Sequence, residues 1–289
     1  MVDIEDKIKA IAANNGASLA GITDVSVSAD LSETEVLLRN VPPDLNYLKT
    51  NIEKRLDIKA WYPAARSVLL CGWQYWNSSM DYEKAISSIQ DYPLFFKQNS
   101  RKFPSEGLLE FCKEKDIPAK ISRYALSRDY HKTIKKKLKV MLKELKALDN
   151  KIDGRVFVDT SPVFEKKLAE RAGLGWQGKN SLIINSKCGS YFFIGGIALS
   201  VPLKSDKPVS SLCADCNLCI KACPTGALSE PGILDPNKCI SYWTTQNKTQ
   251  VPLAIKEKLD GNIYGCDACQ EVCPYNKQQA KIKLSEFMV

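Results

Sequence analysis

Hydrophobic positions in the first two hundred residues fall into two patterns, one with helical spacing and one of short continuous runs typical of buried strands. Residues 1–25 begin with an amphipathic stretch, which predicts a helix, and continue into an apolar strand at 17–25. The apolar run at 65–76 predicts a second strand, and Pro63 marks its approach. Residues 77–107 are mixed and polar, so we expect helix and loop there.

The clearest helical pattern covers residues 131–148. Lysines occupy most of its remaining positions, and such a charge run forms either a solvated face or a surface that meets RNA. The apolar residues at helical spacing are Ile134, Leu138, Met141, Leu142 and Leu145.

Shorter elements follow this helix. Residues 154–159 predict a buried strand that ends in an acid, and residues 165–173 predict a helix stopped by glycine. The apolar segments 181–185 and 190–199 predict a hairpin or two paired strands. Strands that alternate with helices indicate an α/β or α+β sheet domain.

The residue composition changes near residues 205–210, and cysteines, prolines and turn-forming residues are frequent after this point. We therefore expect two domains, 1–207 and 208–289. No apolar run reaches the roughly 18 residues of a membrane span, and the N-terminus lacks the basic start and apolar core of a signal peptide. Both observations predict a cytoplasmic protein that does not enter a membrane.

A cytoplasmic location changes how the 11 cysteines are interpreted, because thiols there stay reduced and clustered cysteines more often hold metal. Cys71, Cys112 and Cys188 stand alone, and we expect buried or incidental thiols. The net charge of +8 suits a polyanionic partner without requiring one.

The other eight cysteines lie in or between two runs. Residues 213–224 follow the C-x2-C-x2-C-x3-C-P spacing of bacterial 4Fe–4S proteins, in which the fourth cysteine binds the other cluster. Residues 266–274 repeat the pattern with one cysteine fewer, and Cys239 is the nearby candidate for the missing ligand. Zinc is the alternative for such spacings. The predicted sets are Cys213, Cys216, Cys219 and Cys273 for one cluster, and Cys223, Cys239, Cys266 and Cys269 for the other.

Three glycines ahead of the cysteines, Gly173, Gly175 and Gly178, form a literal G-x-G-x-x-G. A dinucleotide site needs a strand before this motif, a helix after it and an acid about twenty residues later. Here a helix precedes it, a strand follows and no such acid is present, so we reject that site. The glycines instead favour close backbone approach to another bulky group.

Four longer stretches resemble the epoxyqueuosine reductase family: 122–131, 157–183, 239–244 and 264–276. The resemblance runs from about residue 50 to 276. It implies an α+β fold in which a nitroreductase-like, cobalamin-binding α/β domain precedes a bacterial ferredoxin-like domain with two 4Fe–4S clusters. It further implies a cytosolic enzyme that removes the epoxide oxygen of epoxyqueuosine at the wobble position of tRNA, with electrons delivered through the clusters.

The resemblance also implies roles for individual residues. Asp159 matches the family's proposed proton donor, and an acid at the end of an apolar strand can have a raised pKa. His131, the only histidine, matches a position near the substrate and would orient the nucleotide or assist proton transfer. Lys166 would contact substrate. The expected cobalamin contacts are Arg55, Asp159, Trp176, Gly178, Lys179, Ser181, Ser241 and Asp267.

The chain departs from the family pattern in places. Many members have arginine where this chain has Lys166, which keeps the charge but loses the planar fork that grips phosphate. Ser127 stands where glycine is common. We also expect a short member without the C-terminal helical-repeat domain that helps hold tRNA, a monomer, and an external donor of flavodoxin or ferredoxin type. The alternatives are a dehalogenase-like cobalamin reductase acting on a small molecule and a ferredoxin-like electron-transfer protein.

Overall fold

A computed structural model describes residues 3–26, 34, 38, 41–99 and 106–277. Part of the region expected to be helix and loop, residues 100–105, lies outside this description. So do residues 278–289, at the end of the predicted second domain.

A four-stranded antiparallel sheet forms the centre of the larger part of the molecule. Its order is β1 (Leu19–Asp24), β2 (Ser67–Gln74), β7 (Phe192–Leu199) and β4 (Gly154–Val158). Every residue of β2 is buried, because the strand lies inside the sheet and helices cover both of its faces. The strands predicted near 17–25, 65–76 and 154–159 are thereby confirmed.

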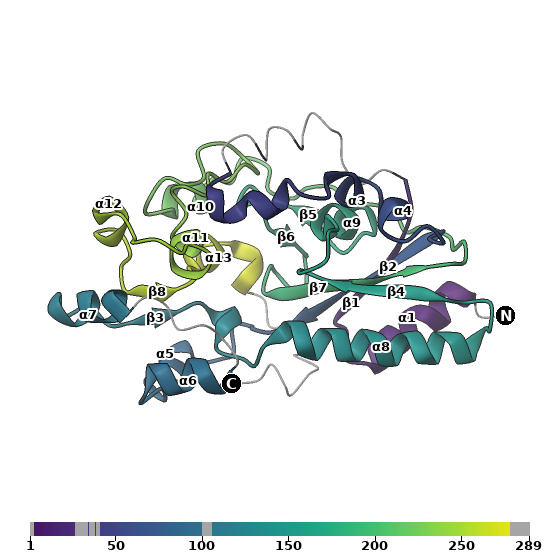
Figure 1. Ribbon diagram of the computed structural model, residues 1–289, viewed down its shortest axis with the longest axis horizontal. Helices are drawn as coiled ribbons and strands as arrows, with labels where there is room; N and C mark the ends of the chain where they lie inside the picture. The colour runs from purple at the N-terminus through teal and green to yellow at the C-terminus, as the bar shows by residue number, and fades with distance from the viewer. Residues whose placement is uncertain (1–2, 27–33, 35–37, 39–40, 100–105, 278–289) are drawn as a thin grey trace.

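Helices pack on both faces of this sheet (Figure 1). Helices α1 (Ile4–Asn14) and α8 (Tyr130–Leu148) cover one face, whereas α9 (Glu165–Arg171), α3 (Ile52–Leu56) and α4 (Ile58–Trp61) cover the other. Helix α8 buries the predicted apolar stripe and leaves most of its lysines exposed. The packing of this stripe fixes the position of α8, and the N-terminus of the helix lies at one end of the sheet.

The predicted pairing of segments 181–185 and 190–199 is wrong. Strand β6 (Ile183–Ile184) pairs with β5 (Trp176–Gln177), while β7 pairs with β2 over eight residues and also with β4. A tight turn with a bridge between Asn185 and Gly189 does reverse the chain. The longer register on β2 satisfies more backbone groups than a local hairpin would, so β7 joins the central sheet.

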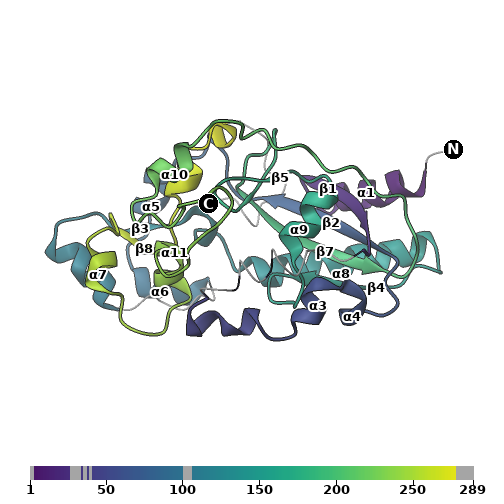
Figure 2. The same ribbon diagram turned by 90° about the horizontal axis from the view of Figure 1, so that it is seen from above.

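The cysteine-rich segment lies at one end of the molecule, together with α5 (Tyr82–Ser87), α6 (Tyr92–Gln98) and α7 (Glu106–Glu114) (Figure 2). Strand β8 (Asn262–Tyr264) in this segment pairs in parallel with β3 (Lys120–Ile121). A strand from before the predicted boundary thus pairs with one from after it. The division at residue 207 stays a prediction.

The remaining elements are short. They are η1 (Pro43–Leu48), α5 (Tyr82–Ser87), α6 (Tyr92–Gln98), α7 (Glu106–Glu114), η2 (Arg123–Ala125), α10 (Leu218–Ala222), α11 (Ile240–Thr245), α12 (Leu253–Lys256), α13 (Ala268–Glu271) and η3 (Pro274–Lys277). None of the helices among the described residues is long and apolar enough to cross a membrane.

Candidate active site

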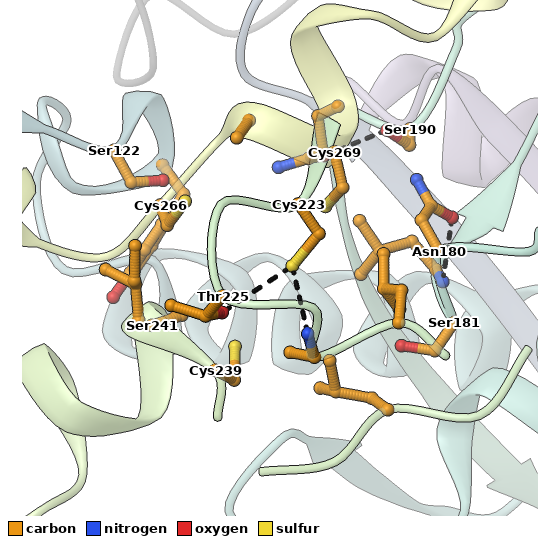
Figure 3. A pocket seen from close by; sticks show the side chains of 18 of the residues that line it. Ser122, Asn180, Ser181, Ser190, Cys223, Thr225, Cys239, Ser241, Cys266 and Cys269 are labelled. Atoms are coloured by element: carbon orange, nitrogen blue, oxygen red, sulfur yellow. Dashed lines mark hydrogen bonds between the residues drawn. The ribbon is translucent and has the colours of Figure 1, made fainter. Parts of the chain in front are cut away.

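One cavity, called the main cavity below, lies where the end of the sheet meets the cysteine-rich segment, and its volume is ≈ 320 Å³ (Figure 3). Four cysteines line it: Cys223 after α10, Cys239 before α11, and Cys266 and Cys269 beside and within α13. They are the set that spacing assigned to the second cluster. The structure also places Cys239, the predicted substitute ligand, beside the other three.

A second cavity of ≈ 130 Å³ is lined by Cys213, Cys216, Cys219 and Cys273, the other predicted set. The indole Nε1 of Trp176 lies 3.4 Å from the sulfur of Cys213, within hydrogen-bonding distance. Among the described residues, no three His, Cys, Asp or Glu side chains are arranged to hold a single metal ion. Each thiolate of a cubane binds a different iron, so its four sulfurs need not converge on one point.

The thiols of the main cavity differ in their surroundings. Burial raises the pKa of Cys266 to about 12, and it raises the pKa of Cys239 as well. Burial also acts on Cys223, but hydrogen bonds from Thr225 and from the Ala227 backbone outweigh it and lower that pKa. Since ligands must be deprotonated, iron binding at this cavity is expected to release protons.

Asn180 lines both cysteine cavities and is only 3% exposed. Its Oδ1 accepts a hydrogen bond from the backbone of Leu182, but its buried Nδ2 has no hydrogen-bond partner in the described part of the chain. Buried polar groups are nearly always satisfied. The unused amide N–H groups therefore fit an acceptor located in one of the cavities, such as a cluster sulfide or a polar cofactor group.

A hydrogen-bonded triad borders the main cavity. Tyr130 lines the cavity, stacks on Phe193 with ring centroids 4.0 Å apart, and donates its hydroxyl to Asp159 Oδ2 at 3.1 Å. The Nε2 of His131 lies 2.9 Å from the same oxygen, and its Nδ1 lies 2.8 Å from Asp129 Oδ1. Asp129 also caps α8 by accepting from the His131 backbone, which fixes the ring at the helix N-terminus.

These contacts determine the charges of the pair. Both ring nitrogens of His131 face carboxylate oxygens, and only the imidazolium form donates from both. Burial alone would lower the pKa of His131, but the hydrogen bonds to Asp159 and Asp129 outweigh it and raise that pKa.

The expectation of a raised pKa for Asp159 is wrong. Burial acts in that direction, but the hydrogen bond and charge of His131 outweigh it and lower the pKa of Asp159. The Asp159 side chain is 53% exposed. In this arrangement the proton resides on the imidazole, and Asp159 is its carboxylate partner.

Two titratable residues of α9 complete this region. Lys166 is exposed at the surface, and its Nζ donates to the Ser181 carbonyl at 3.0 Å. Protein surrounds Lys166 on most sides, so desolvation lowers the pKa of its ammonium group. Glu165 lies beside Asp159, and burial raises the pKa of Glu165 to about 8.

The predicted cofactor residues are divided between several locations. Ser181 and Ser241 line the main cavity. Lys179 lines the second cavity and donates from Nζ to the Ala214 carbonyl at 2.7 Å, and Trp176 packs against that cavity's Cys273 and Tyr275.

Two further predicted cofactor residues, Arg55 and Gly178, make contacts within the protein. Arg55 donates to the Tyr47 carbonyl at 3.2 Å, and its positive charge acts to lower the pKa of Glu165. Gly178 packs its backbone on Ile184, where an added Cβ would lie 2.3 Å from the side chain.

Asp267 is 4% exposed and does not line the main cavity. Its carboxylate accepts from the Ser122 hydroxyl at 2.6 Å and from the Arg123 backbone at 2.8 Å. It thus ties the segment between Cys266 and Cys269 to the residues that follow β3.

Three residues of this region have roles that were not predicted from the sequence: Tyr130, Glu165 and Asn180. Tyr130 and Glu165 directly precede the two residues that were singled out, His131 and Lys166. Their position in those motifs was a usable signal. Nothing local in the sequence indicated that the Asn180 amide is buried between two cysteine cavities.

Two protein families match parts of this chain, and a named relative matches nearly all of it. Residues 212–276 match the family described as a 4Fe-4S double cluster binding domain, which supports an iron–sulfur function for the cysteine-rich segment. Residues 55–160 match the family described as epoxyqueuosine reductase QueG, DUF1730. The epoxyqueuosine reductase of Leadbetterella byssophila is 37% identical over 99% of this chain and 84% of its own length. The chain belongs to the epoxyqueuosine reductase family.

Solved structures agree with this assignment. Epoxyqueuosine reductase from Streptococcus thermophilus superposes with a TM-score of 0.72 at 26% identity, covering 97% of this chain and 69% of that one. An epoxyqueuosine reductase crystallised with an epoxyqueuosine-modified tRNA-Tyr stem loop gives 0.72 at 27% identity, covering 98% and 68%. A B12-dependent reductive dehalogenase gives 0.52 at 17% identity over 94% of this chain and 32% of that one, which shows a shared fold only.

Proposed function

We propose that this chain reduces epoxyqueuosine to queuosine at the wobble position of tRNA. The observation that carries the proposal is the position of Tyr130, which lines the four-cysteine cavity and bonds Asp159. A site for electron carriers therefore borders a site that holds a proton. Family membership indicates the substrate. A relative named epoxyqueuosine reductase aligns with nearly the whole chain, and the structure of an epoxyqueuosine reductase was solved with an epoxyqueuosine-modified tRNA stem loop.

The two cysteine sets are proposed to hold 4Fe–4S clusters, and the main cavity is proposed to take cobalamin beside the second set. Bound cobalamin would supply a cobalt centre that accepts single electrons and reduces the substrate. The lining residues suit its amide-bearing rim, since the buried Nδ2 of Asn180 has no hydrogen-bond partner among the described residues and Ser181 and Ser241 offer hydroxyls.

Removing an epoxide oxygen as water leaves an alkene and consumes two electrons and two protons. Opening of the ring leaves a negatively charged oxygen that needs the first proton. His131 is suited to donate it, because its imidazolium is held between Asp129 and Asp159. After donation, the two carboxylates would stabilise the protonated ring again and so favour its recharging.

Substrate RNA is proposed to approach at the N-terminus of α8. His131 lies in the first turn of this helix, and exposed lysines follow along it at 132, 135, 136, 139 and 143. Such side chains neutralise phosphates without reading sequence. The same proposal includes an external flavodoxin- or ferredoxin-type donor, a monomeric state and a cytoplasmic location.

The test uses anaerobically purified protein with reconstituted clusters, cobalamin, a strong reductant and tRNA that carries epoxyqueuosine. Digested nucleosides are measured by mass spectrometry. We expect the loss of one oxygen mass, dependent on cobalamin and greatly reduced in Asp159→Asn. Asp153→Asn is the matched control, because Asp153 is an exposed acid at the opposite end of β4. No conversion by wild-type protein with full iron and bound cobalamin would refute the substrate assignment.

A further inference from the structure

Glu165 is a second acid in this site with an unusual environment. It is the first residue of α9, and its Oε2 is buried without a hydrogen-bond partner among the described residues. The backbone N–H of Asp159 donates to the same carboxyl group. The charged and titratable groups that face it come from four places: Asp159 after β4, Lys166 on α9, Arg55 on α3 and Tyr130 on α8.

An ionised Glu165 would be costly here. One oxygen would be a buried, unpaired carboxylate, and a second carboxylate, Asp159, lies beside it. Burial and the charge of Asp159 together raise the pKa of Glu165 to about 8, although Lys166 and Arg55 oppose the rise. At neutral pH the side chain is therefore a neutral acid with an O–H to give.

We propose that Glu165 stores the second proton of the reaction and passes it to the His131–Asp159 pair after that pair has donated the first. This role rests on the proposed function, which consumes two protons for each epoxide. The pair alone holds one proton, on the imidazole. Glu165 lies beside Asp159, the member of the pair that is a proton acceptor.

The step balances without any change in oxidation state. The O–H bond of Glu165 breaks, its proton moves to Asp159 and from there to the neutral imidazole, and Glu165 is left as a carboxylate beside the Lys166 ammonium group. Solvent then reprotonates Glu165 before the next turnover. Above the pKa of Glu165 the store is empty, so the reaction loses its second proton source at alkaline pH.

The first test observes the proton itself and needs neither cobalamin nor tRNA. Infrared spectra of the cluster-containing protein are recorded across pH 6–10, and the carbonyl band of a protonated carboxylic acid is followed. We expect a band that disappears with a midpoint near pH 8, persists in Asp159→Asn and is absent in Glu165→Gln. Glu170→Gln is the matched control on the same helix, because Glu170 already accepts from the Gln177 backbone.

The second test is the pH profile of a single turnover on modified tRNA. In the wild type we expect the rate to fall through about pH 8. In Glu165→Gln we expect it to be about 100-fold lower at pH 7, the low end of general acid–base contributions, and to retain only the alkaline fall that deprotonation of His131 causes. If Glu165→Gln does not fold, ¹³C-labelled glutamate in the wild type identifies the band by its isotope shift.

Two results overturn the proposal. One is the absence of a glutamate carboxyl band that titrates near pH 8, and the other is an unchanged rate and pH profile in Glu165→Gln. Failure of the proposed function looks different. In that case the wild type would leave epoxyqueuosine unconverted while the infrared titration of Glu165 still took place.

Discussion

The buried contact between Asp267 and Arg123 allows a quantitative prediction about how the cysteine-rich segment is held. The Asp267 carboxylate accepts from the Ser122 hydroxyl, the Arg123 backbone, the Arg123 guanidinium at 3.1 Å and the Gln270 amide at 3.1 Å. The Asp267 side chain is 5% exposed and the Arg123 side chain is 13% exposed. The same guanidinium lies 4.5 Å from the ring centroid of Tyr82.

The perturbation is Asp267→Asn. An amide has one oxygen where the carboxylate has two, so in either orientation its NH2 group faces a donor. Removing one partner of a buried pair typically costs about 3–5 kcal/mol. At about 2 °C per kcal/mol for a chain of this size, the midpoint of thermal unfolding should fall by about 6–10 °C.

The control is Glu271→Gln, which removes the other acid on the same guanidinium. Glu271 lies 2.6 Å from Arg123 Nη1, but its side chain is 50% exposed. A solvent-exposed pair contributes about 0–1 kcal/mol, so we expect a fall of about 2 °C or less. Both variants are measured by calorimetry with matched iron content.

Equal shifts in the two variants would refute the argument from burial. A shift below about 2 °C in Asp267→Asn would mean that the carboxyl group is neutral in the folded protein, since burial raises the pKa of Asp267.

Three further predictions concern the imidazole, the unusual cluster ligand and a glycine. Because His131 is the only histidine, its NMR titration is unambiguous; we expect a pKa above the usual 6.5, decreasing in Asp159→Asn. The raised pKa of His131 contributes stability to the fold that is lost as pH rises through that pKa. The lowered pKa of Asp159 contributes stability that is lost as pH falls through that pKa. An unchanged dependence of stability on pH in Asp159→Asn would therefore contradict the pairing. Cys239→Ser should lower iron content by about half while Cys188→Ser leaves it unchanged, and equal iron in both would remove Cys239 from the ligands. Gly175→Ala places a Cβ 2.1 Å from the Ile184 carbonyl and should cost about 1–3 kcal/mol in urea unfolding, whereas Gly107→Ala, with open space around it in α7, should be neutral or stabilising.

Local patterns in the sequence were sufficient for the parts of the fold that depend on local spacing. The stripe from Ile134 to Leu145 predicted α8 because burial of one helix face imposes that period. The cysteine spacing predicted two crossed sets, and each set lines one cavity. The G-x-G-x-x-G glycines were expected to face another bulky group, whereas Gly173 and Gly175 pack against carbonyls of the chain itself, those of Lys207 and Ile184.

The failures arose where distant residues decide the outcome. Segments 181–185 and 190–199 are both apolar, and only the register on β2 determines that they do not pair with each other. The pKa of Asp159 depends on His131, 28 positions earlier in the chain. The bonding of Asp267 depends on Ser122 and Arg123, which precede it by more than 140 residues.

The crossed cysteine sets have a consequence for how the protein is made. Helix α10 carries Cys219 toward one cavity, and Cys223, just after its last residue, toward the other. The last run completes both sites, with Cys273 at one and with Cys266 and Cys269 at the other. During synthesis on the ribosome, the first run must therefore wait for about fifty more residues before either inorganic core has its full complement of thiolates. If the two sets hold clusters as proposed, a chain truncated between the two runs would lack Cys273 at one site and Cys266 and Cys269 at the other, and its incomplete thiol sets would be open to oxidation.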